Sequence, residues 1–242
     1  MQWKGDDYVR LFADPKKCDD ISDLILNVIN KYSLDGVVLE LWSQLGGQAR
    51  SQLTNVIKSI GKKIRQKKKL FILVIPPPIY AGNAVGMFNA EDFDNLVDYV
   101  DFFSLMTYDY SSPAKPGPNA HYGWMRRCVE ILDEESFHRK KILLGLNFYG
   151  YDYTTDGGGP ILGRDFVQML KDHAEQKQLK FNWDDSSQEH FIELKSNGKR
   201  HTIFYPSLNS VQNRLLLAKE MSLGGVAIWE IGQGLDYFYD LL

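Results

Sequence analysis

The sequence predicts an α/β protein built as a βα barrel. Apolar runs of strand length alternate along the 242 residues with segments whose apolar residues recur at helical spacing. Residues 70–75, LFILVI, are apolar throughout, as is typical of a parallel strand in a sheet that is covered on both faces. No strand is followed by the Gly-x-Gly-x-x-Gly of a dinucleotide-binding sheet, and this favours the barrel.

The first strand is expected over residues 34–42, LDGVVLELW, after two helices separated by Pro15. Side chains alternate along a strand, so Val38, Glu40 and Trp42 should share one face. Burying an unpaired charge is costly, so Glu40 must find hydrogen-bond partners or face a polar cavity. It either lines a site or is a satisfied structural carboxylate inside the barrel, and the strand alone leaves both interpretations open.

The second predicted helix and strand unit contains the one basic run, residues 62–69. This run lies where the helix should end before strand 70–75, and cations suit the negative end of a helix dipole. A solvated helix end is therefore the favoured interpretation, with a targeting or heparin patch as the alternative.

The unit then repeats to the end of the chain. An α+β insertion is expected at about 151–206, with one helix and short strands, and Ser207 should cap the helix after it. The other expected elements are helices near 90–99, 122–132 and 208–221, and strands at 102–108, 141–149 and 224–229.

Charge and cysteine content exclude several classes of protein. A net charge of -3 with mixed signs argues against a nucleic-acid partner. Cys18 and Cys128 lie far apart on predicted helices and are expected to be buried free thiols. The N-terminus has no apolar stretch of signal-peptide type, no segment approaches a membrane span, and the five histidines show no metal-binding spacing.

The predicted strand ends carry aromatic, carboxylate and amide side chains. In a βα barrel these ends meet at the face where chemistry takes place. Aromatic rings stack on pyranose rings and carboxylates bind sugar hydroxyls, so we expect a site for a neutral carbohydrate; the alternative is that the rings only close the barrel. The candidate sugar-binding residues are Glu40, Trp42, Tyr108, Asp109, Asn147, Phe148, Tyr149 and Trp229.

Four segments resemble motifs of the family 18 glycoside hydrolases, the chitinases and chitinase-like lectins, which are TIM (β/α)8 barrels. Residues 35–42, DGVVLELW, are similar to the Asp-Gly-x-Asp-x-Asp-x-Glu of that family's fourth strand. The other three are residues 106–109, MTYD, on the sixth strand, residues 145–150, GLNFYG, on the seventh, and residues 224–229, GGVAIW, on the eighth. The resemblance implies one barrel domain over residues 1–242, incomplete at the N-terminus, with strands four to eight present. Such a chain would be a fragment, a short gene product, or a barrel that another chain completes.

The fourth-strand segment departs from the family motif. Trp42 occupies the position of the final Glu, which in the family protonates the glycosidic oxygen. Val38 replaces the deepest acid, and Glu40 is one methylene longer than the middle Asp. Losing a general acid typically lowers a rate by about 10²–10⁴-fold.

The resemblance therefore implies a chitinase-like protein that binds chitooligosaccharides or related glycans without a catalytic acid. Trp229 would be the sugar platform, Trp42 a stacking or gating surface, and Tyr108 and Asp109 polar contacts. Two alternatives remain: a weakly active hydrolase of N-acetylglucosamine-containing glycans with Glu40 or Asp109 as a displaced acid, or a scaffold for a cell-surface receptor. No cofactor or metal is expected, and the full-length form is expected to be secreted or lysosomal.

Overall fold

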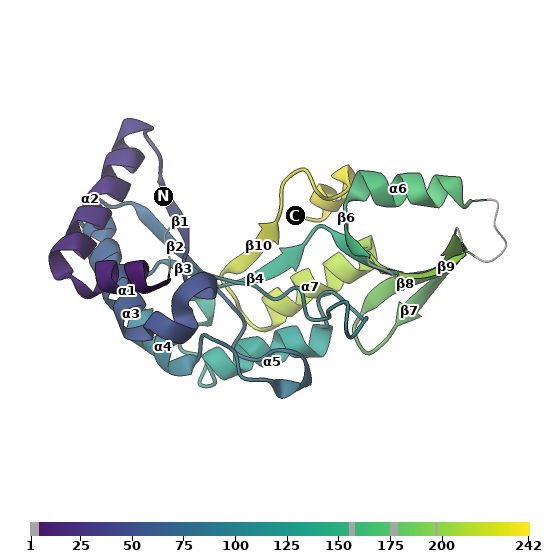
Figure 1. The fold of residues 1–242 in the computed structure, drawn as a ribbon, viewed down its shortest axis with the longest axis horizontal. Helices are drawn as coiled ribbons and strands as arrows, with labels where there is room; N and C mark the ends of the chain where they lie inside the picture. Colours follow the sequence, from purple (N-terminus) through teal and green to yellow (C-terminus); the bar gives the residue numbers. More distant parts are fainter. Residues whose placement is uncertain (1–4, 155–157, 175–178, 197) are drawn as a thin grey trace. The chain divides into compact units, whose positions relative to one another are not determined.

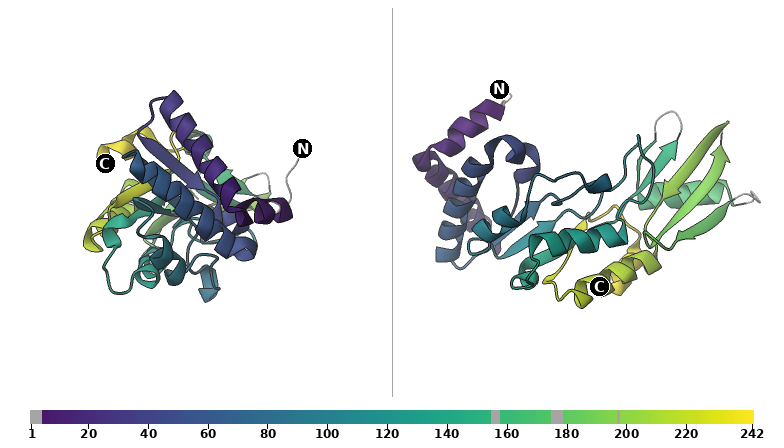
Figure 2. Two further views of the ribbon diagram at one scale, coloured as in Figure 1. Left: turned by 90° about the vertical axis from the view of Figure 1, so that its left-hand side faces the viewer. Right: turned by 90° about the horizontal axis from the view of Figure 1, so that it is seen from below.

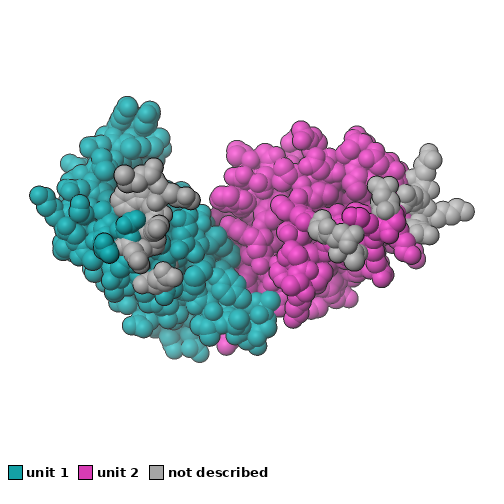
Figure 3. All heavy atoms as spheres, in the orientation of Figure 1, with its two compact units in different colours: residues 1–106, 129–143 teal, residues 107–128, 144–242 magenta. Residues whose placement is uncertain are grey.

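The computed structural model describes residues 5–154, 158–174, 179–196 and 198–242. The chain divides into two compact units (Figure 3). Unit 1 contains residues 1–106 and 129–143, and unit 2 contains residues 107–128 and 144–242. None of the described helices is long and apolar enough to cross a membrane.

Unit 1 is a layer of helices packed against parallel strands (Figure 1). Strand β1 pairs with β2, with Gly36 opposite Leu70, and β2 pairs with β3, with Ile72 opposite Phe102. Helices α2 and α3 lie side by side (Figure 2). The elements are α1 (Gly5–Ala13), α2 (Pro15–Lys31), β1 (Gly36–Glu40), α3 (Trp42–Gln66), β2 (Leu70–Ile75), η1 (Ala81–Asn83), α4 (Ala90–Leu96), β3 (Phe102–Leu105) and η2 (Arg139–Lys141).

The sheet of unit 1 is more deeply buried on one face than on the other. Phe71, Leu73 and Ile75 of β2 are buried, while Leu70 is 47% exposed. On β1, Val38 is 60% exposed. The expectation of strands covered on both faces is therefore wrong for this unit, because the helices cover the side that carries the odd-numbered residues of β2.

The first strand is shorter than the sequence predicts. β1 ends at Glu40, the chain turns at Leu41, and Trp42 is the first residue of α3. The predicted sharing of one strand face by Val38, Glu40 and Trp42 therefore holds only for Val38 and Glu40. The end of α3 is as expected, since it stops at Gln66 inside the basic run.

Unit 2 contains the predicted insertion as a five-stranded antiparallel sheet in the order β6-β5-β9-β8-β7. The strands of the insertion run from Gly150 to Phe204, so the expected α+β insertion before the last strand is confirmed. Its elements are β5 (Gly150–Thr154), β6 (Gly159–Ile161), α6 (Gly163–Asp172), β7 (Lys180–Asp184), β8 (Glu189–Ser196) and β9 (Lys199–Phe204).

The remaining strands are β4 (Ile142–Asn147) and β10 (Gly225–Trp229), which are neighbours in one sheet. Helix α5 (Tyr122–Leu132) has the predicted bounds, and α7 (Leu208–Glu220) begins after Ser207. Ser207 caps α7 as expected, because its side chain accepts the N–H of Ser210. A short helix, η3 (Asp236–Leu241), ends the chain.

Both cysteines are buried free thiols, as expected.

Candidate functional site

The eight candidate residues fall in both units. Glu40 and Trp42 belong to unit 1, at the junction of β1 and α3. The other six belong to unit 2, in the segment after β3, at the end of β4 and at the end of β10.

Trp42 is fully buried. Its indole Nε1 donates to the Met87 carbonyl at 3.0 Å, and its ring packs edge-on against Phe88 with centroids 4.9 Å apart. A tryptophan whose ring is fully buried and whose N–H is hydrogen-bonded inside the protein offers no surface to a sugar. The expected stacking or gating role of Trp42 is corrected accordingly: the residue is part of the core of unit 1.

Glu40 is exposed at the end of β1. Its Oε1 accepts a hydrogen bond from the Ser43 hydroxyl at 2.8 Å. Of the two interpretations that the sequence leaves open, a carboxylate buried in the barrel interior is therefore excluded, and an accessible carboxylate remains.

Asp109 and Tyr149 form a direct contact in unit 2. The Tyr149 hydroxyl donates to Asp109 Oδ1 at 2.5 Å. Burial first, and then the negative charge of Asp109, raise the pKa of Tyr149 well above its ordinary value. The phenol therefore keeps its proton and donates it to the Asp109 carboxylate, whose residue is exposed.

Asp109 adopts a left-handed backbone conformation, with φ of 59°. Aspartate is among the residues that tolerate this region. The Asp109 N–H donates to Asn119 Oδ1 at 2.7 Å, which fixes the turn after Tyr108. The half-buried ring of Tyr108 lies edge-on to Tyr149, with centroids 6.4 Å apart. Tyr108, Asp109 and Tyr149 are thus brought together as predicted.

Asn147 and Phe148 are buried supports. Asn147 Nδ2 donates to the Tyr149 carbonyl at 2.7 Å. Phe148 is fully buried, and its ring packs against Phe238 at 5.2 Å, so its assignment as a sugar contact is corrected. The physical reason is that the chain is buried throughout residues 144–150, so the Phe148 ring lies in the core of unit 2.

Trp229 is the most exposed of the candidate aromatic residues at 46%. It ends β10, its carbonyl accepts the Phe148 N–H at 2.7 Å, and the peptide bond to Glu230 is cis. The hydrogen bond from Phe148 anchors the backbone of Trp229 while the indole is accessible, as a stacking platform requires.

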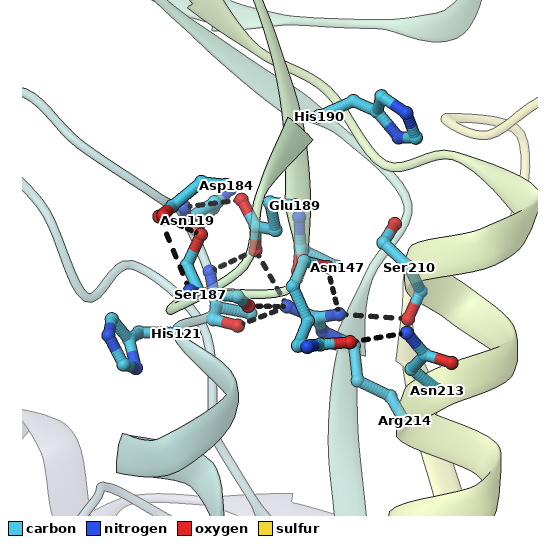
Figure 4. A network of polar contacts seen from close by, with 12 residues as sticks. Asn119, His121, Asn147, Asp184, Ser187, Glu189, His190, Ser210, Asn213 and Arg214 are labelled. Atoms are coloured by element: carbon cyan, nitrogen blue, oxygen red, sulfur yellow. Dashed lines mark hydrogen bonds and ion pairs between the residues drawn. The ribbon is translucent and has the colours of Figure 1, made fainter. Parts of the chain in front are cut away.

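Unit 2 contains a buried polar network that no sequence pattern predicts (Figure 4). Glu189 at the start of β8 pairs with Arg214 of α7 at 3.1 Å, and both side chains are buried. The Glu189 carboxylate also accepts the N–H groups of Asn119 and Ala120. The signal for this network is weak in the sequence, because Glu189 and Asn119 are 70 positions apart. Among the described residues no group of three or more His, Cys, Asp or Glu is placed to hold a metal ion.

Comparison with known families gives one decisive match. The model of the glycosyl hydrolases family 18 matches residues 2–234. The chain belongs to this family. Its TIM-barrel-like α/β fold, with a parallel sheet and an antiparallel insertion sheet, is thereby confirmed.

Curated proteins that are similar in sequence include two from Bacillus subtilis. An uncharacterized glycosylase, YvbX, of Bacillus subtilis is 21% identical over 97% of this chain and 68% of its own length. A cortical fragment-lytic enzyme of the same species is 30% identical over 60% of this chain and 34% of its own length. The chain thus spans between about a third and about two thirds of these curated relatives.

Two solved structures show the fold. A chitinase from Chromobacterium violaceum has a TM-score of 0.84 at 20% identity, over 99% of this chain and 74% of that one. The spore cortex-lytic enzyme SleL of Bacillus megaterium has a TM-score of 0.82 at 18% identity, over 99% of this chain and 56% of that one.

Proposed function

We propose that this family 18 chain binds N-acetylglucosamine-containing glycans and does not hydrolyse them. Membership of the family supports a carbohydrate ligand. The loss of hydrolysis is inferred from residue 42, where the family motif that the segment resembles has a proton-donating Glu.

The burial of Trp42 carries this proposal. A general acid must reach the glycosidic oxygen, and an indole has no proton of suitable acidity to give. Trp42 is fully buried and its N–H is bonded to the Met87 carbonyl. The nearest carboxylate in sequence, Glu40, is exposed and accepts a hydrogen bond from Ser43, an arrangement that suits an acceptor better than an acid.

The proposed binding surface in unit 2 is made by Tyr108, Asp109, Tyr149 and Trp229. Trp229 supplies an accessible ring for a pyranose, and Asp109 supplies a carboxylate oxygen for a hydroxyl or an N-acetyl N–H. Tyr149 holds that carboxylate in place by donating to it.

The names of the relatives suggest two ligands to test, chitin oligosaccharides and the glycan of the spore cortex. The relatives include a chitinase and a spore cortex-lytic enzyme. Residues 116–119, 143–150 and 232–242 also resemble chitinase domain-containing protein, or stabilin-interacting chitinase-like protein, whereas the curated relatives that match in sequence come from Bacillus species. By the same resemblance, we propose a secreted or lysosomal location for the full-length form.

The test is incubation of the chain with chitotetraose, followed by product analysis and by calorimetric titration. We expect binding without measurable hydrolysis. A hydrolytic rate that disappears in Glu40→Gln or Asp109→Asn would overturn the proposal in favour of a hydrolase with a displaced acid. Trp42→Glu should not restore activity, because it places a carboxylate in the core beside Phe88 and Val38 also departs from the family motif.

A second candidate is an interaction scaffold for a receptor. Leu24, Val28 and Tyr32 are 64%, 51% and 62% exposed, and they recur every four residues along α2 and its C-cap. Exposed apolar patches commonly mark interaction sites. If glycan binding is absent and Leu24→Ser with Val28→Ser abolishes association with a receptor, the scaffold function replaces the glycan-binding one.

A further inference from the structure

The pair Glu189–Arg214 uses nearly all of its hydrogen-bonding groups (Figure 4). Arg214 Nη1 donates to the carbonyls of Gln188 and Ser210, and Nη2 donates to those of Ala120 and Ser187 as well as to Glu189 Oε1. The two residues are each 4% exposed. The pair thus links three segments of unit 2: α7, the turn between β7 and β8, and the residues before α5.

Stability alone explains such a pair poorly. Removing two charges from water is costly, and well-packed apolar residues at a buried ion pair are often as stable or more stable. What apolar residues lack is the ability to fix hydrogen-bonding groups in one geometry. The groups fixed here are the backbone N–H groups of Asn119 and Ala120, at 3.0 Å and 2.8 Å from the two oxygens of Glu189.

Asn119 connects the buried ion pair to the proposed binding surface through two hydrogen bonds. Its side-chain Oδ1 accepts the Asp109 N–H at 2.7 Å, and its carbonyl accepts the Tyr110 N–H at 2.8 Å. Asp109 lies in the left-handed region, which aspartate tolerates at some cost, and these hydrogen bonds help to hold it there. The carboxylate of Asp109 then meets the Tyr149 hydroxyl.

We propose that Glu189 and Arg214 are positioning residues, whose buried ion pair holds Asn119 and, through Asn119, the Asp109 carboxylate against Tyr149. The insertion sheet thereby supports the segment after β3, which carries two of the proposed glycan contacts. This role rests on the proposed function for its effect on binding, but the geometry of Asp109 can be measured without any ligand.

The experiment compares two matched substitutions in the full chain. Glu189→Gln removes the buried charge, and Glu220→Gln removes the charge of a second Glu–Arg pair in unit 2, the exposed contact of Glu220 with Arg126 at 2.9 Å. Arg214→Lys is a milder third variant that keeps the positive charge but not the planar fork. The readouts are the NMR resonances of the Asp109 amide and the Tyr149 ring carbon that bears the hydroxyl, the melting temperature, and the affinity for chitotetraose.

We expect Glu189→Gln to shift both resonances and to weaken chitotetraose binding about tenfold. Arg214→Lys should change the resonances and the affinity in the same direction as Glu189→Gln. Glu220→Gln should leave the resonances and the affinity unchanged. A lower melting temperature with both resonances and the affinity unchanged would show a purely structural pair and overturn the proposal. If Glu189→Gln does not fold, the resonances and the affinity of Arg214→Lys decide whether the pair has a positioning role. If neither variant folds, the pair is a folding determinant and the proposal fails. If the unmodified chain does not bind chitotetraose, the proposed function fails while the resonances still decide the positioning role.

Discussion

Two tryptophans, Trp42 and Trp229, lie in segments that resemble family motifs but have opposite surroundings, and this difference can be tested residue by residue. Trp229 is 46% exposed and Trp42 is fully buried. We expect Trp229→Ala to weaken chitooligosaccharide binding with little change in stability. Loss of a stacking aromatic ring costs about 1–3 kcal/mol at nucleic-acid sites, and a sugar platform should lie on the same scale. Calorimetric titration of the variant measures the effect.

A control for Trp229→Ala is Phe181→Ala, which removes a comparably exposed ring, 56%, from β7 in the same unit and should leave the affinity unchanged. If Trp229→Ala binds as tightly as the unmodified chain, the platform assignment is wrong.

Trp42→Ala should instead act on folding. It removes a fully buried indole and its hydrogen bond to Met87, and truncation of a buried aromatic residue typically lowers the free energy of unfolding by about 3–5 kcal/mol. Urea unfolding followed by circular dichroism measures the loss. If Trp42→Ala is as stable as the unmodified chain but has lost glycan affinity, the assignment of Trp42 to the core is wrong and the residue contributes to glycan binding.

At the scale of the element, a histidine contacts the residue that caps the N-terminus of α7. His190 Nδ1 lies 2.8 Å from the hydroxyl of Ser207, the residue that caps the helix, and burial lowers the pKa of His190 below its ordinary value of 6.5. The folded state therefore binds fewer protons at this site than the unfolded chain does once the pH falls below about 6.5, so stability is lost as the pH drops through that value.

We expect His190→Gln to reduce this pH dependence. The measurement is the free energy of unfolding in urea at about pH 7.5 and about pH 5.5, where an ordinary histidine changes its charge. The unmodified chain should lose more stability than the variant between the two values. Equal losses in both proteins would show that protonation of His190 is not coupled to folding.

The sequence predicts the local elements of this molecule better than its long-range contacts. Helix α5 and strand β2 have their predicted bounds, and the Ser207 cap of α7 was expected, because periodicity and capping are local properties. The prediction that Trp42 shares a strand face with Val38 and Glu40 was wrong. Nothing in the apolar run 34–42 signals that the strand ends at Glu40 and that a helix begins at Trp42.

The candidate site was predicted in part for the same reason. The meeting of Tyr108, Asp109 and Tyr149 follows from the rule that strand ends gather at one face of a βα barrel. The buried pair Glu189–Arg214 does not follow from any local pattern, because its geometry exists only once the insertion sheet has formed.

At the scale of the whole molecule, the exposed edge of the parallel sheet predicts self-association. Among the described strands, β1 is the end strand of its sheet, paired with β2 on one side. Its residue Val38 is 60% exposed. An uncovered, apolar edge strand offers unpaired backbone groups to another chain, and a lysine on such an edge opposes the pairing.

We therefore expect the unmodified chain to associate with increasing concentration, and Val38→Lys to shift it towards monomer. Val85→Lys is the matched control, because Val85 is 86% exposed but lies outside the named strands, so it should leave association unchanged. Sedimentation velocity over a range of concentrations distinguishes the three proteins. An unmodified chain that stays monomeric throughout and melts in one sharp cooperative transition would mean that the edge of β1 is protected in solution, and that this strand contributes nothing to contacts between copies.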